Sequence, residues 1–163
     1  MVSDADYKSV VEFLFKEVRL ADEARYAEWQ ALWTDDGVYW VPATTDPAAT
    51  PDTHLSHIYD NRTRITTRVK LLQTGHRYSQ EPPSLMRRLL SNIEVEAADG
   101  GELAAASNFI LAELSIQAGH EMHWWVGRTT HRLRRVDGQL RMSRKTVVLV
   151  NAAEPLPNLA FLL

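Results

Sequence analysis

Residues 3–18 place apolar side chains at the spacing of an amphipathic α-helix. The apolar positions recur at i, i+3, i+4 and i+7, which gathers them on one helix face. Ser3 or Asp4 can cap the first turn through a side-chain oxygen. We therefore predict a helix at the start of the chain, and its buried face carries Tyr7, Val10, Val11, Leu14, Phe15 and Val18.

A second helical pattern begins at Asp22 and continues to Trp33. Its apolar positions are Tyr26, Trp29, Leu32 and Trp33. Residues 34–37, Thr-Asp-Asp-Gly, have turn chemistry and should end this helix. The β-formers at 38–41 then predict a short strand, and Pro42 should keep it from continuing as a central strand.

Residues 43–54 show no periodicity and contain two prolines, which predicts a surface loop. From Asp60 onwards the pattern becomes helical again, with apolar side chains at Ile65, Val69 and Leu72. The β-branched run at 65–67 competes with this interpretation, because such side chains favour strands. We favour a third helix here.

Residues 86–152 lack a helical period and read as strands. Turn signals at 99–101, 118–119 and 137–138 divide them into four β candidates joined by hairpins. The length of 163 residues fits one domain spanning 1–163. The sequence therefore predicts an α+β fold in which three N-terminal helices pack on one face of a strongly curved, mostly antiparallel sheet.

The predicted strands carry large apolar groups on both faces. Trp124 and Trp125 are neighbours in sequence, so on a strand they point to opposite faces, as do members of the apolar run 147–150. Three helices can cover only one face of the sheet. We expect the second face to meet another subunit; alternatively, one tryptophan belongs to the core and its neighbour is a tolerated exposed aromatic.

Composition excludes several kinds of chemistry. The chain has no cysteine, which excludes zinc ribbons, iron–sulfur ligation by thiolates and a cysteine nucleophile. A net charge of −3 argues against general nucleic-acid binding. No stretch is long and apolar enough for a membrane span or a signal peptide, so we expect a soluble cytoplasmic protein.

Two histidine pairs have residue types that bind metals. His54 and His57 lie close to Asp60, and His120 and His123 form a second i, i+3 pair. In a strand, however, i, i+3 positions face opposite sides of the sheet. We do not expect either pair to hold a metal, and we expect His131 to be a solvated surface residue.

A curved sheet closed by helices encloses a pocket in which a desolvated side chain can act as a general base. Asp60, His57 and Tyr39 are the candidates for this role. Alternatively, Asp60 caps the third helix, and Tyr39 fills the core with its hydroxyl bonded.

The predicted last hairpin is rich in arginine. We interpret these side chains as the polar edge of the hairpin or as partners for an acidic surface of another protein. They are Arg128, Arg132, Arg134, Arg135, Arg141 and Arg144.

The order and spacing of short motifs along nearly the whole chain resemble the small, or beta, subunit of aromatic-ring-hydroxylating dioxygenases. The motifs are Arg25-Tyr26-x-x-Trp29-x-x-Leu32, Thr34-Asp35-Asp36, Tyr39-Trp40-Val41-Pro42, Ser56-x-x-Tyr59-Asp60-Asn61-Arg62, Arg68-Val69-x-x-Leu72-x-Thr74-Gly75, Pro82-Pro83-Ser84, Arg87, Ser91-Asn92, Gly127-Arg128, Leu133-Arg134-Arg135 and Asn158-Leu159-Ala160-Phe161-Leu162-Leu163. The resemblance implies a cone-shaped α+β fold of the kind shared with nuclear transport factor 2 and scytalone dehydratase.

The resemblance also implies a partner rather than an active site in this chain. In such oxygenases a large alpha subunit holds a Rieske [2Fe-2S] cluster and a mononuclear iron, and NADH supplies electrons through a reductase. The beta subunit is mainly structural and forms a homotrimer within an α3β3 assembly. We expect no cofactor, metal, nucleic acid or membrane at this chain. The candidate interface anchors are Trp40, Arg77, Pro82, Pro83, Arg87, Trp124 and Trp125.

The alternative function is a freestanding cone-fold dehydratase or isomerase. It would use Asp60 or His57 as the general base on a small apolar substrate.

Overall fold

A computed structural model describes residues 1–74, 84–116, 119–157 and 159–163. Its elements in chain order are helices α1 (Asp4–Asp22) and α2 (Tyr26–Gln30), strands β1 (Trp33–Pro42) and β2 (Ser56–Asp60), helix α3 (Arg62–Gln73), strand β3 (Leu85–Ala97), the 3-10 turn η2 (Asp99–Gly101) and strands β4 (Leu103–Ser115), β5 (Glu121–Val136) and β6 (Gln139–Leu149). The strands form one sheet in the order β2-β1-β6-β5-β4-β3. Among the strands that the structure describes, the β1–β6 pair alone is parallel.

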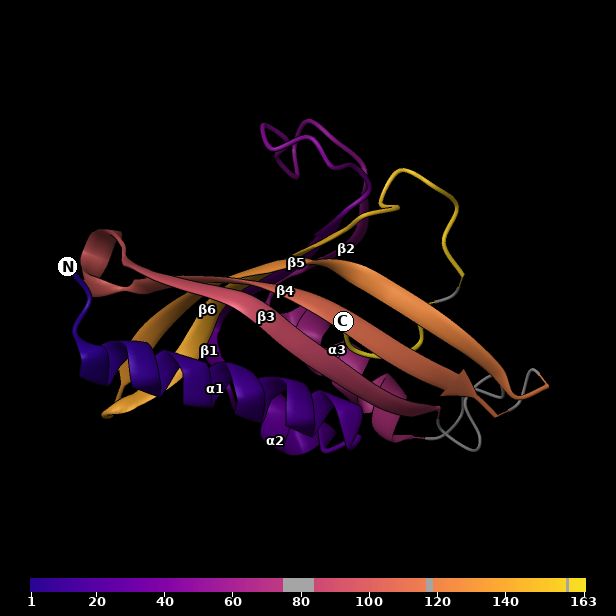
Figure 1. Cartoon of the computed structure of the whole chain (residues 1–163), viewed down its shortest axis with the longest axis horizontal. Helices are drawn as coiled ribbons and strands as arrows, with labels where there is room; N and C mark the ends of the chain where they lie inside the picture. The colour runs from indigo at the N-terminus through magenta and orange to yellow at the C-terminus, as the bar shows by residue number, and fades with distance from the viewer. Residues whose placement is uncertain (75–83, 117–118, 158) are drawn as a thin grey trace.

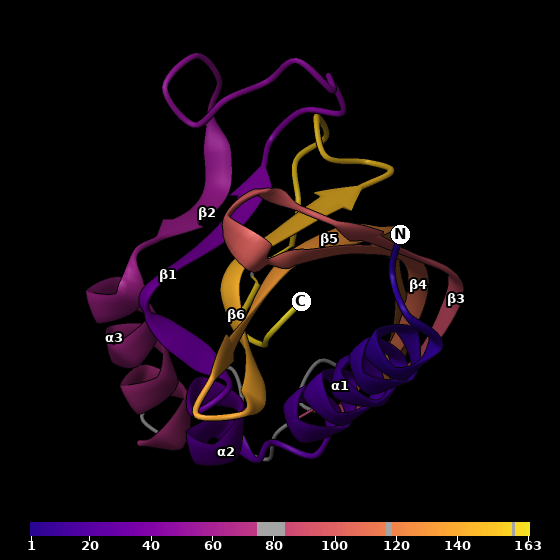
Figure 2. The same cartoon turned by 90° about the vertical axis from the view of Figure 1, so that its left-hand side faces the viewer.

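The sheet curls over the three helices, which all lie against one of its faces (Figures 1 and 2). The space between the sheet and the helices, called here the cone interior, contains the aromatic core. In this core Trp29 lies edge-on to Trp33, with ring centroids 5.5 Å apart, and also to Tyr39. The predicted α+β architecture, with helices on one face of a mostly antiparallel sheet, is confirmed. In the described parts of the chain, no helix is both long and apolar enough to span a membrane.

Helix α1 begins as predicted, but its buried face differs in part from the predicted one. The Ser3 Oγ accepts a hydrogen bond from the backbone N–H of Asp6 at 3.1 Å, which caps the first turn. Tyr7 and Phe15, predicted to be buried, are about half exposed. The buried positions are Val10, Phe13, Leu14, Glu17, Leu20 and Ala21. The prediction is confirmed for Val10 and Leu14 and was wrong for Tyr7 and Phe15, because it counted only apolar residues and left out Glu17, which is buried on this face.

The second predicted helix is shorter than expected. It ends at Gln30, and β1 already begins at Trp33. Residues 34–37 do not form a turn; they are a bulge in the strand, where the register with β6 shifts between Trp33 and Val38. Gly37 is needed there because a Cβ would overlap the ring of Trp33.

Strand β2 was not predicted from the sequence, whose loop pattern runs directly into the third helix. It pairs with β1 so that Tyr39 lies opposite Asp60. The third helix is confirmed, but Asn61 caps it by accepting a hydrogen bond from the N–H of Arg64 at 3.0 Å. Asp60 is therefore not the cap.

Candidate functional site

The three candidate acid–base residues have separate partners. Asp60 is buried and binds Arg68 at 2.6 Å. The Tyr39 hydroxyl donates to the carbonyl oxygen of Leu163 at 3.2 Å, and burial raises the pKa of Tyr39 well above its ordinary value. His57 Nε2 lies 2.7 Å from the carbonyl oxygen of Ala152. Each group is thus held by the protein itself.

His57 and Asp60 do line one open cleft of about 500 Å³ between β2 and α3, together with Arg64 and Arg68. Tyr39 does not line this cleft. The arrangement does not place the three candidates around one position where a substrate atom could react, which a shared acid–base mechanism requires.

The cone interior contains a charged cluster that the sequence analysis missed. Glu17 Oε1 accepts hydrogen bonds from Lys145 Nζ at 2.7 Å and from Trp29 Nε1 at 2.6 Å. His131 Nε2 lies 3.8 Å from Glu17 Oε2. All three ionisable side chains are at most 4% exposed. The prediction that His131 is a solvated surface residue was therefore wrong.

Burial and charge act against each other in this cluster. Burial alone would raise the pKa of Glu17, but the Lys145 ammonium, His131 and Arg88 together hold it far below its ordinary value. Burial lowers the pKa of His131 and of Lys145, although Glu17 opposes both shifts. The histidine is therefore neutral at pH 7, while Glu17 is ionised.

Side chains fill the cone interior around this cluster. The void beside Glu17, Arg88, His131 and Lys145 is about 10 Å³, which is the space of a single water molecule. A substrate the size of an aromatic ring does not fit this void.

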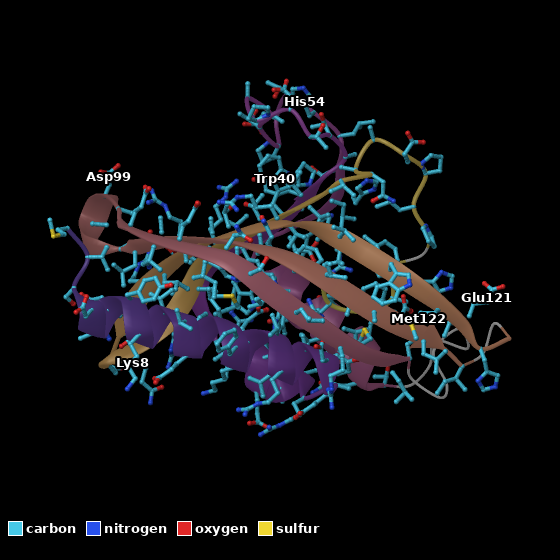
Figure 3. The ribbon with its side chains drawn as sticks, viewed as in Figure 1. Lys8, Trp40, His54, Asp99, Glu121 and Met122 are labelled. Carbon is cyan, nitrogen blue, oxygen red and sulfur yellow. The ribbon has the colours of Figure 1, made fainter. Side chains whose placement is uncertain are left out.

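The histidine pairs also have partners other than a metal. The Nδ1 of His54, in the loop that rises above the sheet in Figure 3, lies 2.8 Å from Thr53 Oγ1. His123 lies 3.8 Å from Glu121. Within the described ranges, no group of three or more His, Cys, Asp or Glu residues is arranged to hold a metal ion.

The face of the sheet that points away from the helices, called here the outer sheet face, carries a continuous apolar row. Leu89 pairs with Ile110, Ile110 with Val126, and the N–H of Val150 donates to the carbonyl of Val126. These four side chains are 36–69% exposed. They line an apolar groove of about 670 Å³, which Thr45 of the loop above the sheet borders.

The next row along the same face adds an exposed tryptophan. Arg87, Ala112 and Trp124 lie side by side across β3, β4 and β5, and Trp124 is 64% exposed. Met122, near the start of β5 in Figure 3, extends the apolar surface. We call the set the apolar half of the outer face; it consists of Leu85, Leu89, Ile110, Met122, Trp124, Val126 and Val150.

The other half of the outer sheet face is charged. A hollow of about 360 Å³ has a floor of Ala104–Ala106 and walls that include Glu94, Glu96, Arg132 and Arg144. Arg144 stacks over the ring of Trp40 at 5.5 Å from the ring centroid. Both signs of charge therefore lie close together beside the apolar half.

Most of the remaining hairpin arginines form ion pairs within the chain. This agrees with the prediction that they form the polar edge of the hairpin. Arg134 binds Asp36 and Glu102, each at 3.0 Å, and Arg135 binds Asp6 at 2.8 Å.

The interface candidates are divided between the surface and the core. Arg87 and Trp124 are exposed on the outer face, whereas Trp40 is 8% exposed. Trp125 is buried and donates its indole N–H to Glu113 at 2.9 Å, so it belongs to the core of its own chain. Arg77, Pro82 and Pro83 lie outside the described residues.

Comparison with known proteins agrees with this geometry. The family described as ring hydroxylating beta subunit matches residues 16–153. The small oxygenase component of the p-cumate 2,3-dioxygenase system of Pseudomonas putida is 36% identical over 141 residues, which cover 86% of this chain and 77% of that protein.

Two solved structures share the fold. The beta subunit of benzoate 1,2-dioxygenase from Burkholderia mallei has a TM-score of 0.77 at 23% identity, with 99% of each chain covered. A chain of naphthalene 1,2-dioxygenase, solved with indole bound in the active site, has a TM-score of 0.80 at 16% identity, with 99% of this chain and 95% of that chain covered. With its family match over most of its length, this chain belongs to the ring hydroxylating beta subunit family.

Proposed function

We propose that this chain is the structural, non-catalytic subunit of a multicomponent aromatic-ring-hydroxylating dioxygenase. A large alpha subunit would hold the Rieske [2Fe-2S] cluster and the mononuclear iron and add both atoms of dioxygen to an aromatic ring. NADH would supply the electrons through a reductase, and the assembly would work in the cytoplasm. The observation that carries this proposal is the exposed apolar half of the outer sheet face, which is suited to a protein partner.

The residues of this chain do not fit the iron centres of such an oxygenase. A Rieske cluster takes two cysteine and two histidine ligands, and the chain has no cysteine. His54, His57, His123 and His131 each lie beside a different group of this chain, and no group of three or more His, Cys, Asp or Glu residues in the described ranges is arranged to hold a metal ion. The iron chemistry is therefore assigned to the partner, and this chain would contribute shape and attachment.

We further propose that the chain forms a homotrimer within an α3β3 assembly and that the outer sheet face is covered by a neighbouring copy. Burying an apolar surface is the main source of free energy in subunit association. The adjoining hollow presents Glu94 and Glu96 close to Arg132 and Arg144. Because the face carries both negative and positive side chains, it can form complementary charge pairs with a second copy of the same chain.

The mass of the purified chain in solution tests this assignment. Light scattering should give three chains per particle for the unaltered protein. Ile110→Asp places a charge in the centre of the apolar half and should give a folded monomer. Leu55→Asp is the matched control and should stay trimeric, because Leu55 is 85% exposed and lines neither the apolar groove nor the charged hollow of the outer face.

The same measurement with a co-expressed alpha subunit separates the possible occupants of the face. If Ile110→Asp remains trimeric alone but fails to bind alpha, the outer face belongs to the alpha interface and our assignment to a neighbouring copy is wrong. If the variant assembles normally in both tests, the outer face is not an interface.

A further inference from the structure

The last residues of the chain are buried inside the cone, although the segment before them is on the surface. Residues 153–155 are exposed. Residues 160–163 are at most 6% exposed, and Figure 2 shows this end of the chain enclosed between the sheet and the helices. The tail, defined here as residues 159–163, is thus a buried segment on an exposed tether.

The cone recognises the tail through main-chain groups as well as apolar contacts. The Tyr39 hydroxyl donates to the Leu163 carbonyl oxygen at 3.2 Å and accepts from the Leu163 N–H at 3.1 Å. Arg88 Nη2 donates to the carbonyl oxygen of Leu162 at 2.8 Å. The ring of Phe161 lies edge-on to Trp125, with centroids 5.2 Å apart.

The groups that bind the tail are fixed by other parts of the protein. The Arg88 guanidinium is held by Asp22 of α1 at 2.8 Å, and the side chains of both are at most 4% exposed. Tyr39 packs against both Trp29 and Trp33. These donors therefore keep their places without the tail, and a preorganised site loses little entropy when it binds a ligand.

We propose that the cone interior is a binding site for a small carboxylic acid with an apolar body, which the chain keeps filled with its own tail. The Tyr39 hydroxyl and the Arg88 guanidinium would bind the carboxylate in place of the Leu163 and Leu162 carbonyl oxygens. An aromatic or branched body would pack on Trp125 in place of Phe161.

The tether sets how strongly a ligand must compete. A segment joined by a short stretch of chain to its own site competes there at an effective concentration in the millimolar range. A free ligand should therefore bind weakly to the unaltered chain and more tightly to a chain whose tail is displaced.

The test uses 3-phenylpropanoate as the probe and 3-phenylpropanol, which lacks the carboxylate, as the control compound. Leu162→Asn would bury a polar amide at a fully buried position and adds no carboxylate beside Arg88, so the tail should leave the cone. Leu55→Asn serves as the matched variant with an intact tail. Ligand binding is followed by NMR through the indole N–H of Trp125, together with the melting temperature.

We expect 3-phenylpropanoate to shift the indole signal saturably in Leu162→Asn, with at least about tenfold tighter binding than in Leu55→Asn. The alcohol should bind less tightly, and adding Tyr39→Phe to Leu162→Asn should weaken acid binding by about fivefold, the value of one hydrogen bond. A folded Leu162→Asn chain that binds neither compound, or binds both equally, would overturn the proposal.

A second measurement needs no variant, so it tests the proposal even if Leu162→Asn does not fold. In the unaltered chain, saturating 3-phenylpropanoate should speed hydrogen exchange of the Leu163 amide, because the acid competes with the tail, and should leave the amides of β4 and β5 unchanged. An unchanged exchange rate at Leu163 would contradict the proposal.

Discussion

Replacing Lys145 by methionine removes one partner of the buried ion pair and keeps most of the side-chain volume. Glu17 would be left fully buried with the Trp29 indole as its remaining hydrogen-bond donor. Removing one partner of a buried pair costs about 3–5 kcal/mol because the other charge stays in a low-dielectric environment. We expect the free energy of unfolding of Lys145→Met to fall by about this amount at pH 7.

Urea unfolding followed by circular dichroism measures this loss. Lys8→Met is the matched control, since Lys8 and Glu12 are 3.9 Å apart with side chains 78% and 68% exposed, and exposed pairs contribute little. Adding Glu17→Gln to Lys145→Met should recover part of the loss, because no buried charge remains.

The pH dependence of Lys145→Met gives a sharper test. Without the ammonium, burial should raise the pKa of Glu17 against the remaining opposing effects of His131 and Arg88. A raised pKa in the folded state contributes stability at low pH that is lost as the pH rises through it. Lys145→Met should therefore gain stability between pH 7 and pH 5 relative to the unaltered chain. A loss under about 1 kcal/mol with an unchanged pH profile would refute the role we give to this pair.

Three further changes test other parts of the structure. Burial lowers the pKa of His131 below 6.5. The free energy of unfolding of the unaltered chain should therefore fall by up to about 1.4 kcal/mol per pH unit as the pH drops from about 6.5 towards that lower pKa. His131→Phe should abolish this dependence in urea titrations. Gly127→Ala should lower the melting temperature by the equivalent of about 1–3 kcal/mol, since the added Cβ overlaps the carbonyl oxygen of Val148; an unchanged melt would mean that the strands adjust freely. Asp60→Asn should lower the melting temperature through the lost ion pair with Arg68 but leave turnover by the assembled oxygenase unchanged, whereas a loss of about 10²-fold would assign Asp60 as a general base.

Sequence periodicity predicted the helices and strands whose own sequence pattern favours the same structure as their packing in the fold. The four strands after residue 84 and helix α3 follow their apolar patterns and turn signals closely. The region from Trp33 to Asp60 does not follow its sequence pattern. Its Thr-Asp-Asp-Gly segment has the residues of a turn but forms a strand bulge held by pairing with β6. Strand β2 depends on β1 for its hydrogen bonds, so its short sequence carries little signal of its own.

The charged cluster was missed for a related reason. Glu17 falls at a helical spacing from Val10 and Leu14, but a carboxylate is normally assigned to the solvent side. Lys145 and His131 reach it from the adjacent strands β6 and β5, over more than one hundred residues of sequence. Only the tertiary structure shows that Glu17 opposes the effect of burial on the pKa of Lys145 and of His131, and that both oppose its effect on Glu17.

Adjacent tryptophans gave the most informative signal. The prediction that both faces of the late strands are apolar is confirmed, because Trp125 is buried under the sheet and Trp124 is exposed above it. What covers Trp124 in the assembly stays a prediction, as do the single-domain boundary and the cytoplasmic location.

Reconstitution of an oxygenase from purified components tests the central claim most directly. Turnover of an aromatic substrate would be measured while this chain is titrated into a fixed amount of alpha subunit with reductase and NADH. The account predicts that turnover rises to a plateau at one chain per alpha subunit, and that this chain alone binds no iron and forms no product. Product formation by this chain alone, or full turnover by alpha without it, would contradict the account.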